Sequence, residues 1–344
     1  MVRTSGDAGS GIVHEFAEEV AIFPLGRLRG LRACASDRGT FVVLALDHRQ
    51  NLRKELSPAD PGTVTTAAMI EFKRAVVRGL ASAATGVLLD PEIGVAQCIV
   101  DGSLPARSGL IVAVEATGYE GASNARASRI LDGWSVAKAK RIGASALKLL
   151  IYYHPQAANA ADQERLVEQV AREAIAEDIP LFLEPLSFSL DPGEGRLKGE
   201  ALREVVIATA HRLTAIGGDV LKAEFPYDAS LTDETRWRSA CEELDAASAL
   251  PWVLLSGGVD GATFEARARI ACQAGASGVL VGRSVWAEAA TLPTAERDDF
   301  LAGEARARLA RLTAIVGESG RSWEMRSPLL TGLGEPLEHW YREA

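Results

Sequence analysis

The chain has 344 residues, of which 47% are hydrophobic and 24% are charged, and its formal net charge at pH 7 is −9. This composition is that of a globular protein with enough apolar material for a large core. The negative charge argues against a surface for nucleic acid or for an anionic membrane, so we expect neither partner, whereas a local basic pocket for a small anion stays compatible with it.

The cysteines and the N-terminal residues indicate the compartment. Cys34, Cys98, Cys241 and Cys272 are scattered without a Cys-x-x-Cys pair, which fits a reducing cytoplasm. Residues 1–11 are rich in Gly and Ser and lack the apolar core of a signal peptide. No apolar run approaches the ~20 residues that a membrane helix needs. We therefore expect a soluble, cytoplasmic protein in which residues 1–12 are disordered.

Apolar runs that end in polar or charged residues recur along the chain and predict strands. They cover residues 41–47, 86–90, 109–116, 146–153, 180–186, 218–226, 251–258 and 278–284. Helical patterns lie before, between and after them. The main predicted helices cover residues 13–34, 63–82, 125–142, 162–177, 261–274 and 300–316.

Strands that are apolar along their whole length are typical of a parallel sheet covered by helices. Eight of them in alternation with helices predict an α/β protein with a (β/α)8 TIM barrel over residues 38–290. We expect one domain over residues 1–344, with a short N-terminal helical extension and, over 291–344, a C-terminal helix and tail that plug the barrel or contact another subunit. The rival fold is a doubly wound open sheet, and no Gly-x-Gly-x-x-Gly follows the first strand to support it.

Lys222 lies in the middle of the predicted sixth strand, between Gly218 and Pro226. A buried ammonium costs several kcal/mol unless it is paired or loses its proton. One interpretation is an ion pair with Glu224 or with a carboxylate from another strand. The other, which we favour, is an amine nucleophile that forms a Schiff base with a carbonyl substrate.

The carboxyl ends of barrel strands meet at one mouth, where such enzymes carry their chemistry. The residues expected there, in strand order, are Asp47, His48, Arg49, Asp90, Glu115, Lys148, Glu184, Lys222 and Glu224. By the alternation of side chains, Glu224 should face the same way as Lys222. Lys148, as a second cation, would help to keep Lys222 neutral, although spacing alone leaves open which lysine is the nucleophile. Glu184 is the best-placed carboxylate for proton transfer, and its alternative role is a salt bridge to Lys148.

The loops after the last two strands predict an anion site. Ser256, Gly257 and Gly258 offer unobstructed backbone N–H groups, and Gly282 and Arg283 add a second small-residue loop with a guanidinium. Barrels often bind phosphate at these two positions. The alternative is that both loops are only tight turns. The histidines have no metal-ligand spacing, so we expect no metal and no cofactor.

The strand ends together resemble one family. The motifs are Leu46-Asp47-His48-Arg49, Glu115-Ala116-Thr117-Gly118-Tyr119, Leu147-Lys148-Leu149-Leu150-Ile151-Tyr152-Tyr153, Phe182-Leu183-Glu184, Asp219-Val220-Leu221-Lys222-Ala223-Glu224, Leu255-Ser256-Gly257-Gly258-Val259 and Gly282-Arg283-Ser284. In this order they resemble the class I aldolases of the tagatose-1,6-bisphosphate aldolase and sulfofructose-1-phosphate aldolase type.

The resemblance implies a role for each motif. Lys222 would be the Schiff-base lysine and Glu184 the acid and base, and Asp47 and Lys148 would line the sugar site. The substrate would be a ketose 1-phosphate or 1,6-bisphosphate, which is cleaved to dihydroxyacetone phosphate and an aldehyde. From fold-level analogy we expect a homo-oligomer. His48 departs from the glutamine usual in the tagatose-bisphosphate enzymes, which leaves the sugar open. The alternatives are a Schiff-base aldolase for another phosphosugar and a sugar-phosphate-binding regulator.

Overall fold

The computed structural model describes residues 24–331, so the expected disorder of residues 1–12, the start of the predicted entry helix and the end of the tail lie outside the described residues. The strands, each parallel to the next, close into a barrel in the order β1 to β8. They are β1 Phe41–Leu46, β2 Gly86–Leu89, β3 Gly109–Ala113, β4 Ala146–Tyr152, β5 Leu181–Leu186, β6 Val220–Ala223, β7 Trp252–Leu255 and β8 Gly278–Val281. The predicted (β/α)8 barrel is confirmed, and the open sheet is excluded because β1 pairs with β8.

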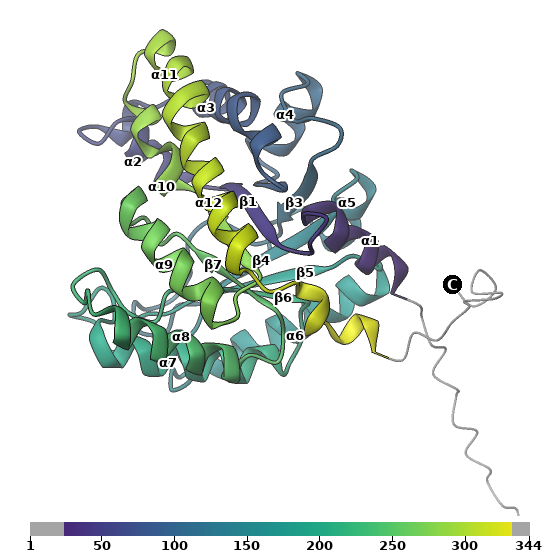
Figure 1. Cartoon of the computed structure of the whole chain (residues 1–344), viewed down its shortest axis with the longest axis vertical. Helices are drawn as coiled ribbons and strands as arrows, with labels where there is room; N and C mark the ends of the chain where they lie inside the picture. Colours follow the sequence, from purple (N-terminus) through teal and green to yellow (C-terminus); the bar gives the residue numbers. More distant parts are fainter. Residues whose placement is uncertain (1–23, 332–344) are drawn as a thin grey trace, which may run out of the picture. The chain divides into compact units, whose positions relative to one another are not determined.

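Helices surround the barrel (Figure 1). They are α1 Leu25–Cys34, α2 Gln50–Leu56, α3 Thr66–Leu80, α4 Val95–Val100, α5 Val136–Arg141, α6 Ala160–Ala176, α7 Gly199–Thr214, α8 Glu234–Ala247, α9 Gly261–Ala274, α10 Arg283–Trp286, α11 Thr294–Phe300 and α12 Arg306–Ser319. The predicted C-terminal helix is α11 and α12, joined by a π-helical turn at Leu301–Ala305. α12 packs against α9 on the outside of the barrel.

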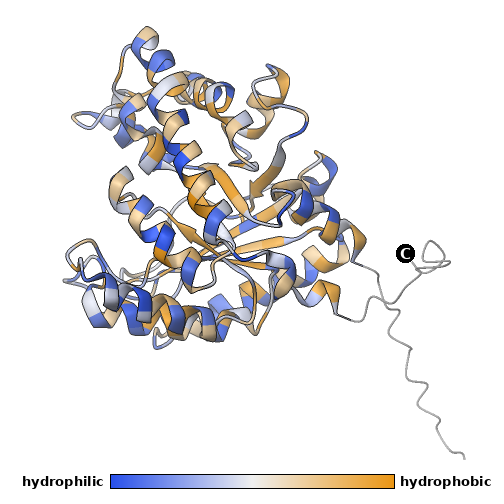
Figure 2. Cartoon of the chain, in the orientation of Figure 1, coloured by the Kyte–Doolittle hydropathy of each residue, from blue (hydrophilic) through white to orange (hydrophobic). Residues whose placement is uncertain are grey.

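Alternation along each strand divides the core into two parts. Leu147, Leu149 and Leu183 belong to the apolar layer between strands and helices. The residues between them face the barrel interior, where Phe41 and Phe182 meet edge to face with ring centroids 5.5 Å apart. Figure 2 shows the strands as hydrophobic and the helices as mixed, as expected for strands buried on both sides. Lys148 and Lys222 also lie on this inner face of the barrel.

The predicted helix over residues 125–142 is wrong in its first part. After β3 the chain forms a hairpin, in which antiparallel bridges join Glu115 to Ile130 and Glu120 to Ala127. Two glycines with positive φ, Gly118 and Gly121, turn the chain, and α5 begins only at Val136, after the side chain of Ser135 caps it. We call residues 115–130 the β3–α5 hairpin.

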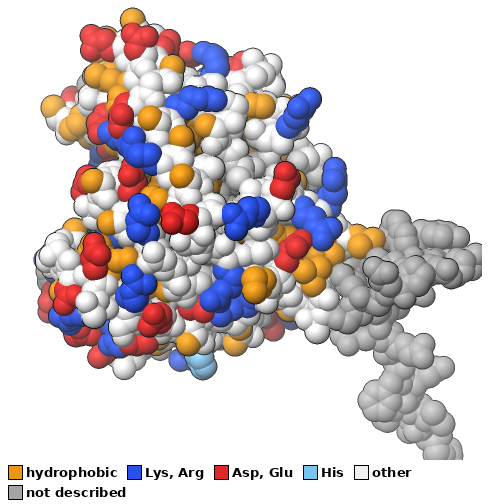
Figure 3. Space-filling model, in the orientation of Figure 1, with side chains coloured by type: hydrophobic (Ala, Val, Ile, Leu, Met, Phe, Trp, Pro, Cys, Tyr) orange, Lys and Arg blue, Asp and Glu red, His pale blue; other side chains and the backbone are white. Residues whose placement is uncertain are grey.

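None of the helices within residues 24–331 combines the length and apolar character needed to cross a bilayer. On the face drawn in Figure 3, acidic and basic side chains are interspersed. On this face, acidic side chains thus lie next to basic ones.

Candidate active site

Charged side chains from five strands converge at the carboxyl end of the barrel. Asp47 follows β1, Glu115 lies just after β3, and Lys148, Glu184 and Lys222 lie on β4, β5 and β6. All but Asp47 are at most 6% exposed. The barrel thus collects two cations and three carboxylates in one buried group, which we call the charged cluster.

Lys148 is the centre of this cluster. Its Nζ lies 2.7 Å from Asp47 Oδ2, 2.7 Å from Glu115 Oε1 and 3.0 Å from Glu184 Oε2. Burial lowers the pKa of Lys148, but the three carboxylates outweigh burial and hold this pKa well above its usual range. Lys148 is therefore a fixed cation.

Three carboxylates surround Lys148 and balance its charge, and the expectation that Lys148 helps to keep Lys222 neutral stays a prediction. Lys222 Nζ lies 2.7 Å from Glu184 Oε1. Glu184 thus contacts both lysines, one with each carboxylate oxygen. The salt bridge between Glu184 and Lys148 is therefore present, and in the same structure Glu184 also lies close enough to Lys222 to exchange a proton with it.

The second carboxylate oxygen of Glu184, Oε2, can accept a hydrogen bond from a bound substrate. Oε2 is buried and accepts no hydrogen bond with good geometry from the part of the chain that the structure describes, although Lys148 lies 3.0 Å away. The Lys148 ammonium stabilises this oxygen, and a carboxylate oxygen has lone pairs enough to accept a further hydrogen bond from a bound hydroxyl.

Asp47 keeps its charge in this setting. Burial raises the pKa of the Asp47 carboxyl, but the charges of Lys148 and Lys222 together hold it well below its ordinary value. His48 stays neutral near pH 7, because burial, with Arg283 and Lys222, lowers its pKa to about 3. The His48 ring stands edge to face against Trp286, and its buried Nδ1 has no hydrogen-bond partner among residues 24–331.

Arg49 and Glu115 are engaged within the protein. Arg49 donates to Glu92 Oε2 at 2.5 Å and to the carbonyl oxygen of Glu115 at 2.9 Å. Glu115 Oε1 accepts from Lys148, and Glu115 Oε2 accepts from the backbone N–H of Leu150 at 3.0 Å. Glu115 thus holds the side chain of Lys148 inside the charged cluster, and Arg49 lies beside the cluster and holds the backbone of Glu115.

The two predicted anion loops lie side by side. Gly282 N–H donates to Ser256 Oγ at 3.4 Å, and a methyl group on Gly258 would come within 2.8 Å of the Arg283 guanidinium. Gly257 and Gly258 have φ values of 61° and 78°, which few residues other than glycine adopt. The loops after β7 and β8 thus present a guanidinium and a glycine backbone to the same space, next to His48.

Two expected site residues face the helices instead of the mouth. Asp90 forms a fully buried ion pair with Lys73 of α3 and accepts from the N–H groups of Glu92 and Ile93. β2 ends at Leu89, so the alternation of side chains no longer applies to Asp90. The expectation for Asp90 is therefore wrong.

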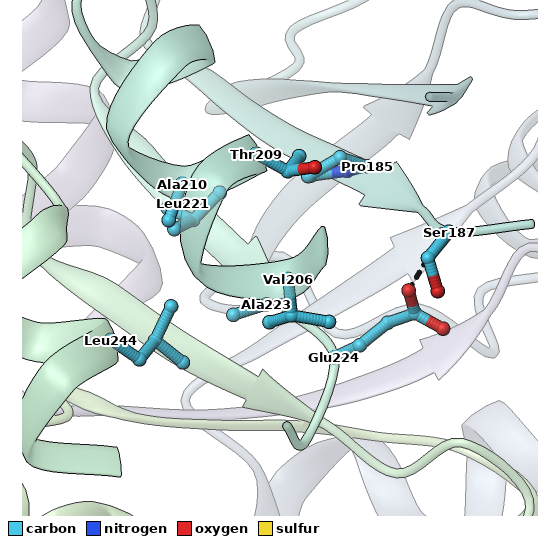
Figure 4. Close-up of a pocket in the computed structure, with 9 residues that line it drawn as sticks. All are labelled: Pro185, Ser187, Val206, Thr209, Ala210, Leu221, Ala223, Glu224 and Leu244. Carbon is cyan, nitrogen blue, oxygen red and sulfur yellow. Dashed lines mark hydrogen bonds between the residues drawn. The ribbon is translucent and has the colours of Figure 1, made fainter. Parts of the chain in front are cut away.

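Glu224 is the second correction. β6 ends at Ala223, and the Glu224 carboxylate accepts from the backbone N–H of Ser187 at 2.6 Å. Figure 4 shows this carboxylate pointing toward Ser187, at a small cavity that also borders Leu221 and Ala223, the residues that flank Lys222. Glu224 thus turns away from Lys222, which pairs with Glu184.

Comparisons with known proteins identify the family to which the chain is similar. The model of the "DeoC/LacD family aldolase" matches residues 41–288. Tagatose 1,6-diphosphate aldolase 1 of Streptococcus pyogenes serotype M3 is 29% identical over 312 residues, 84% of this chain and 94% of that protein. Tagatose 1,6-diphosphate aldolase 1 of Enterococcus faecalis is 30% identical over 280 residues, 75% of this chain and 83% of that protein.

Solved structures share the fold at lower identity. An archaeal fructose 1,6-bisphosphate aldolase has a TM-score of 0.54 and 19% identity and covers 82% of this chain and 98% of its own. The fructose-bisphosphate aldolase of Plasmodium falciparum has a TM-score of 0.65 and 12% identity and covers 88% of this chain and 96% of its own. The family match spans all eight barrel strands and includes every residue of the charged cluster, and the chain belongs to the DeoC/LacD family of aldolases.

Proposed function

We propose that the protein is a class I aldolase that cleaves a ketose 1-phosphate or 1,6-bisphosphate through a Schiff base on Lys222. The observation that carries this proposal is the pairing of Lys222 with Glu184 at 2.7 Å inside the barrel, where Lys222 is 4% exposed. The tagatose 1,6-diphosphate aldolases among its relatives support the class of substrate. Lys148 is unsuited as the nucleophile, because three carboxylates hold it protonated.

Glu184 moves the protons. As a carboxylate it takes one proton from the Lys222 ammonium, and the neutral amine attacks the C2 ketone to give a carbinolamine. Glu184 returns that proton to the C2 hydroxyl, which leaves as water and yields a protonated imine. Glu184 is then again a carboxylate.

Cleavage follows from the imine. Glu184 takes the proton of the C4 hydroxyl, the C3–C4 bond breaks, and its electron pair passes into the imine to form an enamine, while the aldehyde leaves. The proton that Glu184 has taken returns to C3 of the enamine, and addition of water then releases dihydroxyacetone phosphate and restores the Lys222 ammonium and the Glu184 carboxylate. Asp47 and Lys148 hold fixed charges beside the sugar hydroxyl groups, and Ser256, Gly257, Gly258, Gly282 and Arg283 hold the C1 phosphate.

Reductive trapping tests the proposal. Incubation with dihydroxyacetone phosphate and sodium borohydride, followed by peptide mapping and mass spectrometry, is expected to place one adduct on Lys222. Phosphate binding without an adduct would reject the Schiff base and favour a sugar-phosphate-binding regulator. An adduct on Lys148 would transfer the nucleophile to that residue.

Glu184→Gln is expected to lower kcat by about 10²- to 10⁴-fold, because an amide cannot accept the C4 proton. Steady-state cleavage measured by coupled reduction of the products checks this expectation. Glu224→Gln is the matched control, since Glu224 contacts Ser187 outside the charged cluster, and it should retain turnover. Unchanged kcat in Glu184→Gln would remove Glu184 from proton transfer.

A further inference from the structure

One arginine at the mouth of the barrel has no carboxylate partner among residues 24–331. Arg126, on the β3–α5 hairpin, has its guanidinium carbon 4.8 Å from the ring centroid of Tyr119, 5.6 Å from that of Tyr152 and 5.3 Å from that of Phe188. Its Nε donates to the carbonyl oxygen of Ser123 at 2.9 Å. Within residues 24–331 no carboxylate oxygen lies within 4 Å of it, whereas Arg49 and Arg283 both have acidic partners.

The hairpin holds Arg126 over the end of β4. Ser128 Oγ accepts from the backbone N–H of Tyr152 at 2.9 Å, and Asn159 donates to the carbonyl oxygen of Arg126 at 2.9 Å. Tyr119 and Tyr152 stand edge to face, with ring centroids 5.1 Å apart. The aromatic rings and the guanidinium's own hydrogen bonds, from Nε to Ser123 and from Nη2 to the carbonyl oxygen of Gly195 at 3.3 Å, restrict it to one place, so that little conformational entropy is lost when it binds an anion.

Tyr152 relates the position of Arg126 to that of the charged cluster, because it contacts Arg126 and lies on the same strand as Lys148. Tyr152 and Lys148 are four residues apart on β4, so their side chains lie on the same face of the strand. Burial raises the pKa of the Tyr152 hydroxyl, and Arg126, Lys148 and Glu184 are all close enough to influence it electrostatically. Arg126 therefore borders the space above Lys148 and Glu184.

The strand order fixes the direction in which a substrate would lie. In the closed barrel β8 is opposite β4, and β7 is opposite β3. A ketose with its C1 phosphate on the loops after β7 and β8, and with C2 at Lys222, extends across the mouth toward the ends of β3 and β4. The far end of such a chain reaches the region of Tyr119, Tyr152 and Arg126.

We propose that Arg126 recognises an anionic group, phosphate or sulfonate, at the far end of the ketose substrate. This inference rests on the proposed function. A planar guanidinium can bind either tetrahedral anion with two hydrogen bonds. Arg126 is a specificity residue that contacts the aldehyde half of the substrate and leaves the chemistry at C2 to C4 unchanged.

The test compares Arg126→Met with the wild type on three substrates: a ketohexose 1-phosphate, its 1,6-bisphosphate, and a 6-deoxy-6-sulfo ketohexose 1-phosphate. We expect kcat/KM for whichever of the two substrates with an anionic far end is preferred to fall by about 10- to 100-fold, through KM, which is the effect of losing one charged hydrogen-bonding group. The 1-phosphate should change by less than about threefold. The preference of the wild type between the second and third substrates identifies phosphate or sulfonate.

Two further variants separate recognition from folding. Arg126→Lys keeps the charge and should recover part of the loss. Arg129→Met removes an arginine of the same hairpin that pairs with Glu120 and Asp132, and it should leave the ratio between substrates unchanged. An equal fall of kcat/KM for all three substrates in Arg126→Met, or no fall for any, would overturn the proposal.

Failure of the proposed function gives a different result. If the wild type cleaves none of the three ketoses, their dissociation constants are measured by calorimetry. The recognition by Arg126 stands if the wild type binds a ketose with an anionic far end more tightly than the 1-phosphate and Arg126→Met loses that difference. It falls if the two proteins show the same order of affinities.

Discussion

Lys222→Ala is expected to abolish aldol cleavage, with a fall in kcat on the order of 10⁴-fold or more, as found when other enzymes lose their nucleophile. The physical reason is that only an amine at this point can form the imine that accepts the electrons of the C3–C4 bond. Borohydride trapping with dihydroxyacetone phosphate should disappear in parallel. Loss of both signals from one substitution would tie turnover to the covalent intermediate.

A control lysine separates this effect from a general loss of positive charge. Lys138 is exposed on α5 and donates to the carbonyl oxygen of Gly133. Lys138→Ala should keep both turnover and trapping. If Lys222→Ala still yields an adduct, mapped to Lys148, then Lys148 is the nucleophile despite its carboxylate partners. If it still turns over substrate without an adduct, the reaction does not use a Schiff base.

The sequence supports prediction of the barrel because its strands are buried on both faces. Runs such as residues 41–46 and 252–255 are apolar throughout, which distinguishes them from half-exposed strands. The convergence of Asp47, Lys148, Glu184 and Lys222 follows from the same reasoning, since all lie at the carboxyl ends of strands in one barrel. Their residue types and their order along the chain thus predict which groups meet.

Which lysine pairs with which carboxylate in the charged cluster depends on the strand register and on where the strands end, and the sequence does not show either directly. Leu150 pairs with Glu184 between β4 and β5, and this register sets the height of the carboxylate relative to Lys148. Strand ends matter equally, because Asp90 and Glu224 each come one residue after their strand has finished and turn to the helices. Once a strand has ended, the alternation of side chains no longer predicts which side a charge faces, since Asp47 also follows its strand by one residue and yet faces the cluster.

The β3–α5 hairpin, which carries Arg126, could not be predicted from the composition of its residues. Residues 125–142 contain enough alanine and basic residues to predict a helix, whereas the observed helix is only Val136–Arg141. Gly118, Gly121 and Gly133 all have positive φ, and Ser135 is the N-cap. The glycines and this serine are the signals that indicate two turns and a late helix start.

Lys148→Met is expected to lower the free energy of unfolding by about 3–5 kcal/mol at pH 8, because it leaves Asp47, Glu115 and Glu184 as buried carboxylates without their shared cation. Urea unfolding followed by circular dichroism measures this loss. The control is Lys140→Met, since Lys140 is half-buried and, in the part of the chain that the structure describes, donates only to the carbonyl oxygen of Asp178. Its cost should be about 1 kcal/mol.

The pH dependence of this loss tests its electrostatic origin. In the wild type, the depressed pKa of Asp47 contributes stability above the unfolded pKa of about 4, and the raised pKa of Lys148 contributes it below about 10, so both contributions are complete from about pH 5 to 9. Without Lys148 the carboxylates bind protons more readily when folded than when unfolded. The stability deficit of Lys148→Met should therefore shrink as the pH falls from 8 to 5.5. A deficit independent of pH would instead assign the loss to packing, because methionine fills the space differently from lysine.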